Sequence, residues 1–223
     1  MAKLIVLEGL DGSGKSTQTE LLRQKLEALG KKVRVIDFPD YKSDGSILVR
    51  MYLGGQLGEK PSDTNAFAAS TFFAADRYVS YVTDWKKDYQ DEETIILANR
   101  YTTANAYHQL SKMPKEAWDD FLAWLWDFEF TKLGLPSPDR VILLDMPESV
   151  SSEMVRERSL QTGRKIDIHE KDIDYLVSCR NAAKYVAEKC SWTVVPCAEE
   201  GDKIPHEMHA ISDEVFAKIS DLI

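Results

Sequence analysis

The sequence has no long hydrophobic run, few cysteines and fewer basic than acidic residues. No apolar stretch approaches the roughly 20 residues of a membrane span, and the four apolar residues that separate Met1-Ala2-Lys3 from Glu8 are too few for a secretory signal. Cys179, Cys190 and Cys197 form no C-x-x-C pair, which favours reduced, buried thiols over disulfides or zinc. A net charge of −9 argues against a general nucleic-acid surface. We therefore expect a cytoplasmic protein that binds neither membranes nor nucleic acid.

Linkers, internal repeats and low-complexity segments are also missing, so residues 1–223 are predicted to form a single domain. Short apolar segments alternate with helical patterns along the whole chain. This alternation predicts an α/β fold, a parallel sheet with helices on both faces. The five expected strands are residues 4–7, 33–38, 94–98, 141–144 and 192–195.

The most informative motif fits the phosphate-binding pattern G-x-x-x-x-G-K-[ST]. It follows an apolar strand and precedes leucines at helical spacing, which is the order that such a loop requires. The glycines and the helix start favour an anion such as a triphosphate. Lys15 is expected to reach the β and γ phosphates, and the Ser16 hydroxyl to bind Mg²⁺. The predicted ATP-binding residues are Gly9, Leu10, Asp11, Gly12, Ser13, Gly14, Lys15, Ser16 and Thr17.

A second notable segment is the expected helix over residues 65–87, which is apolar nearly all round. Such a helix must bury two faces, so we expect it to form the interface of a homodimer. Asp76 and Arg77 lie in its middle and are costly to bury without partners. Two interpretations stay open: an internal ion-pair arrangement or a ligand-binding role.

The remaining motifs narrow the reaction class. The guanine-reading Asn-Lys-x-Asp of GTPases is missing. A kinase whose acceptor already carries a phosphate needs cations beside the loop, and Arg77 and Arg100 are the candidates. Arg100 follows the strand 94–98, and ligands of parallel sheets gather at the carboxyl ends of strands. Two alternatives remain: a deoxynucleoside kinase, with an uncharged acceptor and a general base, and a non-catalytic nucleotide sensor.

The chain resembles bacterial thymidylate kinases, which phosphorylate dTMP to dTDP with Mg-ATP. The matching segments are residues 8–17, Phe38-Pro39, residues 73–77, residues 99–101 and the late helix that contains Asp167, His169, Glu170, Asp174 and Tyr175. The resemblance implies a P-loop fold with strand order 2-3-1-4-5 and a mobile lid near residues 156–170. Another nucleoside monophosphate kinase is the nearest alternative.

The resemblance also implies roles for individual residues. Phe73 would stack on thymine, Arg77 would hydrogen-bond its carbonyl edge, and Arg100 would hold the acceptor phosphate. Asp11 would lie beside the acceptor sugar, where it could accept a proton or hold magnesium waters. The same pocket would be lined by Phe38, Tyr41, Asn105 and Gln109.

Phosphoryl transfer needs a cation in the transition state, and residues 10–13 of the loop offer none. Similar proteins supply it from the lid, so Arg156, Arg158 and Arg164 are candidates, with Arg164 the first choice.

Three positions depart from the family pattern. Asn99 replaces an aspartate that orients magnesium waters, so Asp11 or Glu8 would have to serve. Asp40 replaces an arginine, whose phosphate contact would pass to Arg50 or Lys42. The alanine and tyrosine that usually follow Arg-Tyr are shifted by one position, which would leave Tyr107 or His108 to press on the sugar and exclude a 2′-hydroxyl.

Overall fold

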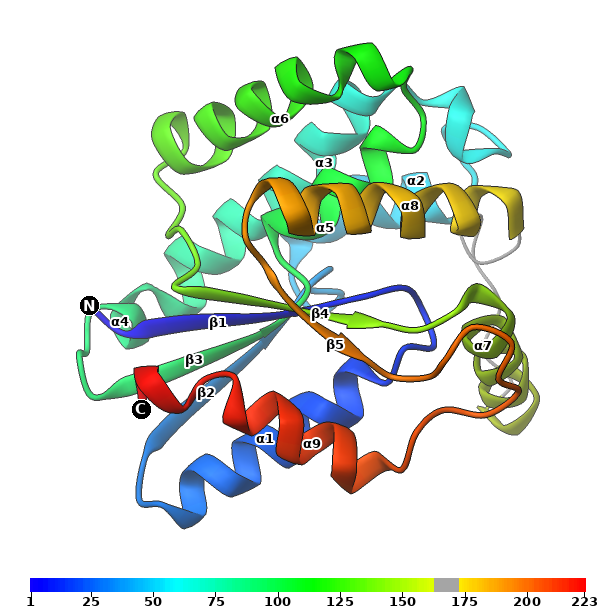
Figure 1. Ribbon diagram of the computed structural model, residues 1–223. Coiled ribbons are helices and arrows are strands. Elements are labelled where there is room, and N and C mark those ends of the chain that lie inside the picture. The colour runs from blue at the N-terminus through cyan, green and yellow to red at the C-terminus, as the bar shows by residue number, and fades with distance from the viewer. Residues whose placement is uncertain (163–172) are drawn as a thin grey trace.

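The computed structural model (Figure 1) describes residues 1–162 and 173–223, apart from the side chains of residues 158, 162 and 173. Five parallel strands form one sheet in the order β2-β3-β1-β4-β5, which confirms the strand order that the resemblance implied. The strands are β1 Lys3–Glu8, β2 Lys32–Asp37, β3 Thr94–Asn99, β4 Arg140–Asp145 and β5 Thr193–Pro196.

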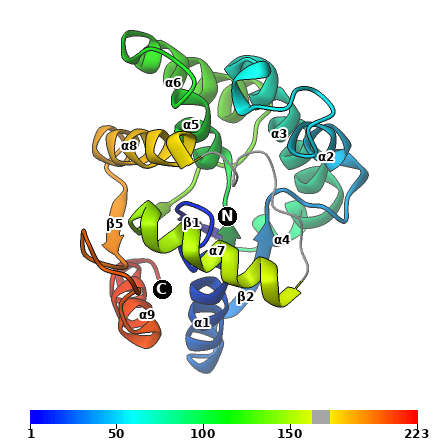
Figure 2. The same ribbon diagram turned by 90° about the vertical axis from the view of Figure 1, so that its right-hand side faces the viewer.

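Helices cover both faces of this sheet (Figure 1). Helices α1 and α9 lie on one face, and α3, α5, α6 and α8 lie on the other. Helix α7 crosses the edge of the sheet at which the phosphate-binding loop lies (Figure 2). The helices are α1 Lys15–Ala28, α2 Ile47–Leu53, α3 Ala66–Ser80, α4 Lys86–Tyr89, α5 Thr102–Leu110, α6 Trp118–Trp126, α7 Glu148–Thr162, α8 Ile173–Lys189 and α9 Met208–Ala217.

The sequence of β1 explains why both faces are covered. Its side chains alternate between two cores: Ile5 and Leu7 pack with α1 and α9, while Leu4 and Val6 face the opposite side. All four are fully buried. A strand that is apolar on both faces must lie inside a sheet sandwiched by helices.

Several helix boundaries differ from the expected ones. The apolar segment expected as one helix over 65–87 begins at α3, capped by the Asn65 side chain, but becomes a π-helix over Tyr81–Trp85 and ends in α4. The π-helix carries Trp85 into the core, where its ring meets that of Tyr101. The closing helix, expected over 206–222, runs over α9 only, because the Glu207 side chain caps its start.

The carboxyl ends of the strands place polar residues at one edge of the sheet: Glu8 from β1, Asp37 from β2 and Asn99 from β3. The phosphate-binding loop leaves β1 at the same edge. None of the helices within residues 1–162 and 173–223 is both long and apolar enough to cross a membrane.

Candidate active site

The phosphate-binding loop joins β1 to α1 and closes against α7. A Cβ atom on Gly12, whose φ is +82°, would lie 2.2 Å from the Ser151 carbonyl oxygen of α7. Only glycine allows both this backbone conformation and this close approach. Beside the loop lies a cavity of about 390 Å³, to which α7 contributes Met154, Glu157 and Gln161. Glu157 and Gln161 fall within the lid predicted near residues 156–170, but none of the three residues was predicted to line the site.

Lys15 and Ser16, the residues predicted to meet phosphate and metal, begin α1 and line this cavity. The Lys15 ammonium group donates to the carbonyl oxygens of Gly9 at 3.0 Å and Leu10 at 2.7 Å. Its side chain is buried, with 7% exposure of the residue. The loop backbone therefore holds this cation at the cavity wall, at the position that the motif predicts.

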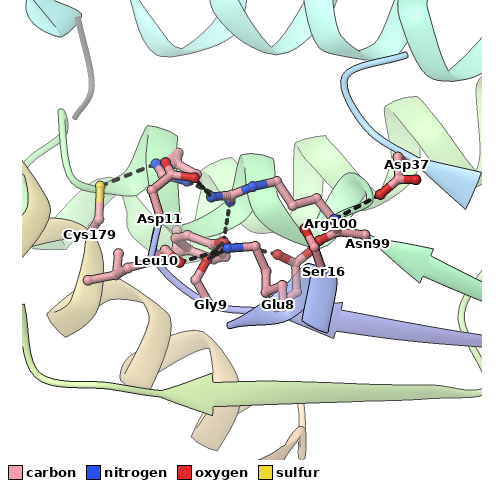
Figure 3. Close-up of polar contacts among 12 residues, drawn as sticks. Glu8, Gly9, Leu10, Asp11, Ser16, Asp37, Asn99, Arg100 and Cys179 are labelled. Carbon is pink, nitrogen blue, oxygen red and sulfur yellow. Dashed lines mark hydrogen bonds and ion pairs between the residues drawn. The ribbon is translucent and has the colours of Figure 1, made fainter. Parts of the chain in front are cut away.

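Arg100 lies directly against the loop, in a left-handed backbone conformation with φ 65°. This conformation is costly for arginine and is concentrated at functional sites. Its Nη2 donates to Asp11 Oδ1 at 2.9 Å, and its Nη1 donates to the Tyr107 hydroxyl at 2.8 Å (Figure 3). Burial opposes charge on Asp11, but Arg100 and Lys15 together hold the pKa of this carboxyl well below its usual range. Asp11 and Arg100 are thus a charged pair at the cavity.

Glu8, the last residue of β1, is fully buried behind this pair. Burial raises its pKa, against the lowering influence of Arg100 and of two hydroxyl donors. The donors to its carboxylate are the Tyr101 backbone N–H at 3.0 Å, the Thr103 hydroxyl at 2.5 Å and the Tyr107 hydroxyl at 3.0 Å. Glu8 therefore organises the start of α5.

The structure shows Arg77 in an ion pair, but its partner is Glu129 and not Asp76. Arg77 Nε and Nη2 donate to the two Glu129 oxygens at 2.7 and 2.6 Å, and the side chains are 2% and 0% exposed. Thr102 and Asn105 donate to the same carboxylate. Neighbouring residues of a helix do not face each other, so Asp76 turns away and accepts the Asp40 backbone N–H at 2.9 Å.

The sequence also predicted Phe38, Phe73, Asn105 and Gln109 as acceptor residues. Asn105 reaches α3 through the Ser70 carbonyl at 3.3 Å, and Phe73 packs edge-on against Tyr52. Gln109 is fully buried, and neither its amide oxygen nor its amide nitrogen has a hydrogen-bond partner within the described part of the chain. An amide with both groups unpaired is costly unless a ligand completes it. Phe38 lines the phosphate cavity.

The structure separates the residues expected near the phosphate and sugar. Arg50 Nη1 donates to the carbonyl oxygens of Tyr41 and Ser43, both at 3.2 Å, and so holds the loop that contains Tyr41. Tyr107 is fully buried, with its hydroxyl between Arg100 and Glu8, so in this structure it cannot press on a sugar. His108, at 7% exposure, retains some exposed surface. Its Nε2 lies 3.0 Å from Arg100 Nη1; because a guanidinium only donates, this nitrogen accepts.

The expected lid is only partly described. Arg156 is exposed and pairs with Glu153 at 2.8 Å, on the same helix. The Arg158 side chain and the whole of Arg164 lie outside the described residues, as do Asp167, His169 and Glu170. Among residues 1–162 and 173–223, Lys42 makes only a backbone contact, in which its N–H donates to Asp40.

The oxygen atoms at the cavity suit a magnesium ion. The Ser16 hydroxyl lines the cavity, and the buried Asn99 Oδ1 has no partner among residues 1–162 and 173–223. Hydroxyl and amide oxygens are hard donors of the kind that Mg²⁺ prefers.

All three cysteines are free thiols, and burial raises the pKa of Cys179 and of Cys197 to about 12.

Comparison with known proteins gives one consistent result. A model of the family described as thymidylate kinase matches residues 7–207. A thymidylate kinase of Mycobacterium tuberculosis is 31% identical over 175 residues, which cover 77% of this chain and 79% of that protein. A probable thymidylate kinase of Saccharolobus solfataricus is 26% identical over 204 residues, 92% of this chain and 93% of that protein. A probable thymidylate kinase of Methanococcus maripaludis is 30% identical over 174 residues, 77% and 74% of the two chains.

Proposed function

The chain belongs to the thymidylate kinase family, and we propose from this membership and from the site that it transfers the terminal phosphoryl group of ATP to dTMP. The products are dTDP and ADP, so the protein is a nucleoside monophosphate kinase of nucleotide biosynthesis. The observation that carries this proposal is the 2.9 Å contact between Arg100 and Asp11, which puts a cation for an acceptor phosphate directly on the loop for the donor phosphates.

On the donor side, residues 9–17 hold the ATP phosphates. Backbone N–H groups and the start of α1 meet the negative charge, and Lys15 turns from the loop carbonyls towards the β and γ phosphates. A magnesium ion, when bound with ATP, neutralises charge on the transferred group. Ser16 and the unpaired Asn99 oxygen are the groups that would hold it or its waters.

On the acceptor side, Arg100 holds the phosphate of dTMP, which competes with Asp11 for the guanidinium. Released from Arg100, the Asp11 carboxylate accepts a hydrogen bond from the sugar or from metal-bound water. Phe73 stacks on thymine. Arg77 donates from Nη1 to its carbonyl edge, where this group now makes a long 3.4 Å contact to the Tyr101 carbonyl oxygen, while Glu129 fixes the other side of the guanidinium. The unpaired Gln109 amide hydrogen-bonds to the edge of the base. Asn105, Phe38 and Tyr41 line the pocket around it.

Three further roles follow from the sequence and its resemblance. His108 lies against the sugar, and Arg50 acts through the loop of Tyr41 and Ser43. One of the lid arginines closes on the transferred phosphoryl group; the candidates are Arg156, Arg158 and Arg164, in a lid spanning about residues 156–170. We also propose that residues 1–223 form one domain. The cytoplasm, where reduced thiols persist, is the proposed location.

We propose a homodimer formed through the helix of residues 65–87. Support comes from a row of large apolar side chains on one face, Phe67, Tyr78 and Val82, which are 44%, 42% and 47% exposed. Phe67 continues this row to α6, since its ring lies 4.7 Å from that of Trp124. A contiguous apolar face of this kind is typical of a protein interface.

A coupled assay of ADP release tests the function, with thymidine, dTMP, dUMP, dCMP and dGMP as acceptors. We expect turnover with dTMP and none with thymidine. Turnover with thymidine would identify a deoxynucleoside kinase, and ATP binding without any turnover would identify a sensor. Arg100→Ala should raise KM for all monophosphates alike, whereas Gln109→Leu should change their ratios by about 10-fold or more, because the base edge is then unread.

A further inference from the structure

The end of β3 carries an amide, Asn99, beside the phosphate-binding loop. Asn99 Nδ2 donates to Ser16 Oγ at 3.1 Å and to Asp37 Oδ1 at 2.8 Å (Figure 3). Asp37 ends β2 and is paired in register with Asn99, so the two side chains emerge on the same face of the sheet. The Asn99 backbone carbonyl also accepts the Phe38 N–H at 3.1 Å, which fixes the exit of β2 at this point. Asp37, Asn99 and Ser16 therefore form a connected row that ends on the phosphate-binding loop.

The other nearby carboxylates already have strong partners. Glu8 is fully buried and receives three donors from α5 and its N-terminal residue. Asp11 pairs with Arg100 at 2.9 Å. Asp37, in contrast, is exposed, and its only side-chain partner in the described part of the chain is the Asn99 amide. Within the described residues one carboxylate oxygen of Asp37 thus has no hydrogen-bond partner, and the other accepts from Asn99, which lines the phosphate cavity.

We propose that Asp37 supplies the carboxylate of the magnesium site and that Asn99 holds it there. This inference rests on the proposed use of Mg-ATP. Magnesium keeps several waters when bound to proteins, and carboxylates outside its direct ligands orient those waters. An aspartate at position 99 would repel Asp37 at 2.8 Å, whereas an amide donates to both Asp37 and Ser16.

The test measures how strongly Mg²⁺ strengthens nucleotide binding, independently of turnover. The Kd of a fluorescent ADP analogue is determined with Mg²⁺ and with EDTA. The ratio of the Kd in EDTA to the Kd with Mg²⁺ measures how much the ion strengthens binding, and we call this ratio the coupling. Asp37→Asn should reduce this ratio by about 10-fold or more, while Kd in EDTA stays the same or falls slightly because a negative charge is removed near the phosphates. The control is Glu93→Gln, which removes one charge just before β3, at the opposite edge of the sheet, and should leave the ratio unchanged.

The double variant Asp37→Asn with Asn99→Asp moves the carboxylate to β3 and should recover most of the lost coupling. An unchanged ratio in Asp37→Asn would overturn the proposal, as would an equal loss in Glu93→Gln. A double variant as weak as the single one would also overturn it, because the loss would then come from a disturbed Asn99. If the unsubstituted protein bound no nucleotide in either condition, the proposed function itself would fail instead.

Discussion

The buried pair of Arg77 and Glu129 gives the sharpest prediction about stability. Both side chains are essentially inaccessible, at 2% and 0% exposure, and Glu129 is the common acceptor for Arg77, Thr102 and Asn105. Glu129→Gln preserves the volume but leaves the guanidinium as an uncompensated buried charge. Breaking a buried pair in this way costs about 3–5 kcal/mol, a large share of the roughly 5–15 kcal/mol that stabilises a typical domain.

The double-mutant cycle separates the ion pair from the loss of packing. Arg77→Met should also cost about 3–5 kcal/mol, because it leaves Glu129 without its counter-charge. The variant with both changes contains no buried charge at this place, so it should be more stable than the sum of the single costs predicts, by about 3 kcal/mol.

Urea unfolding followed by tryptophan fluorescence measures these free energies by linear extrapolation. Protein concentration must be the same throughout, since a dimer unfolds in a concentration-dependent way. Additivity within about 0.5 kcal/mol, or single costs below about 1 kcal/mol, would refute the assignment of a stabilising buried pair.

Three further predictions concern catalysis, pH and assembly. Lys15→Ala should lower kcat by at least about 100-fold while the variant remains folded in the absence of urea, and a folded variant with substantial turnover would contradict the loop assignment. Burial lowers the pKa of Lys112 to about 8. Below pH 8 the lysine is charged in both the folded and the unfolded protein, and its burial is then most unfavourable. As pH rises from 8 towards 10.5, the folded protein loses this proton before the unfolded protein does, so the free energy of unfolding increases. Lys112→Met should therefore stabilise the fold by about 3 kcal/mol at pH 7, less the lost hydrogen bond to Tyr52, and urea unfolding should show the gain shrinking towards pH 10.5. Tyr78→Glu should convert the proposed dimer to monomer in sedimentation velocity at micromolar concentration, and an unsubstituted protein that is already monomeric would remove the basis for that interface.

Local patterns were sufficient for the fold class and for the phosphate-binding loop. Apolar segments such as residues 4–7 must be buried on both faces, and glycines at fixed positions before Lys15 leave one way to arrange the backbone. The strand order came from the resemblance and is confirmed. Arg100 was also found from sequence, because a residue that directly follows a parallel strand lies at the ligand-binding edge.

Only the tertiary structure showed which polar groups satisfy one another. Glu129 lies 52 residues from Arg77, in a segment that reads as aromatic core, and no local pattern connects the two. Asp37 and Asn99, 62 residues apart, meet because β2 and β3 pair in register. The Tyr107 hydroxyl points inward and donates to the buried Glu8 carboxylate, 99 residues away. Hydrogen-bond partners of buried polar groups depend on chain segments that folding brings together, whereas burial itself is already encoded in local apolar spacing.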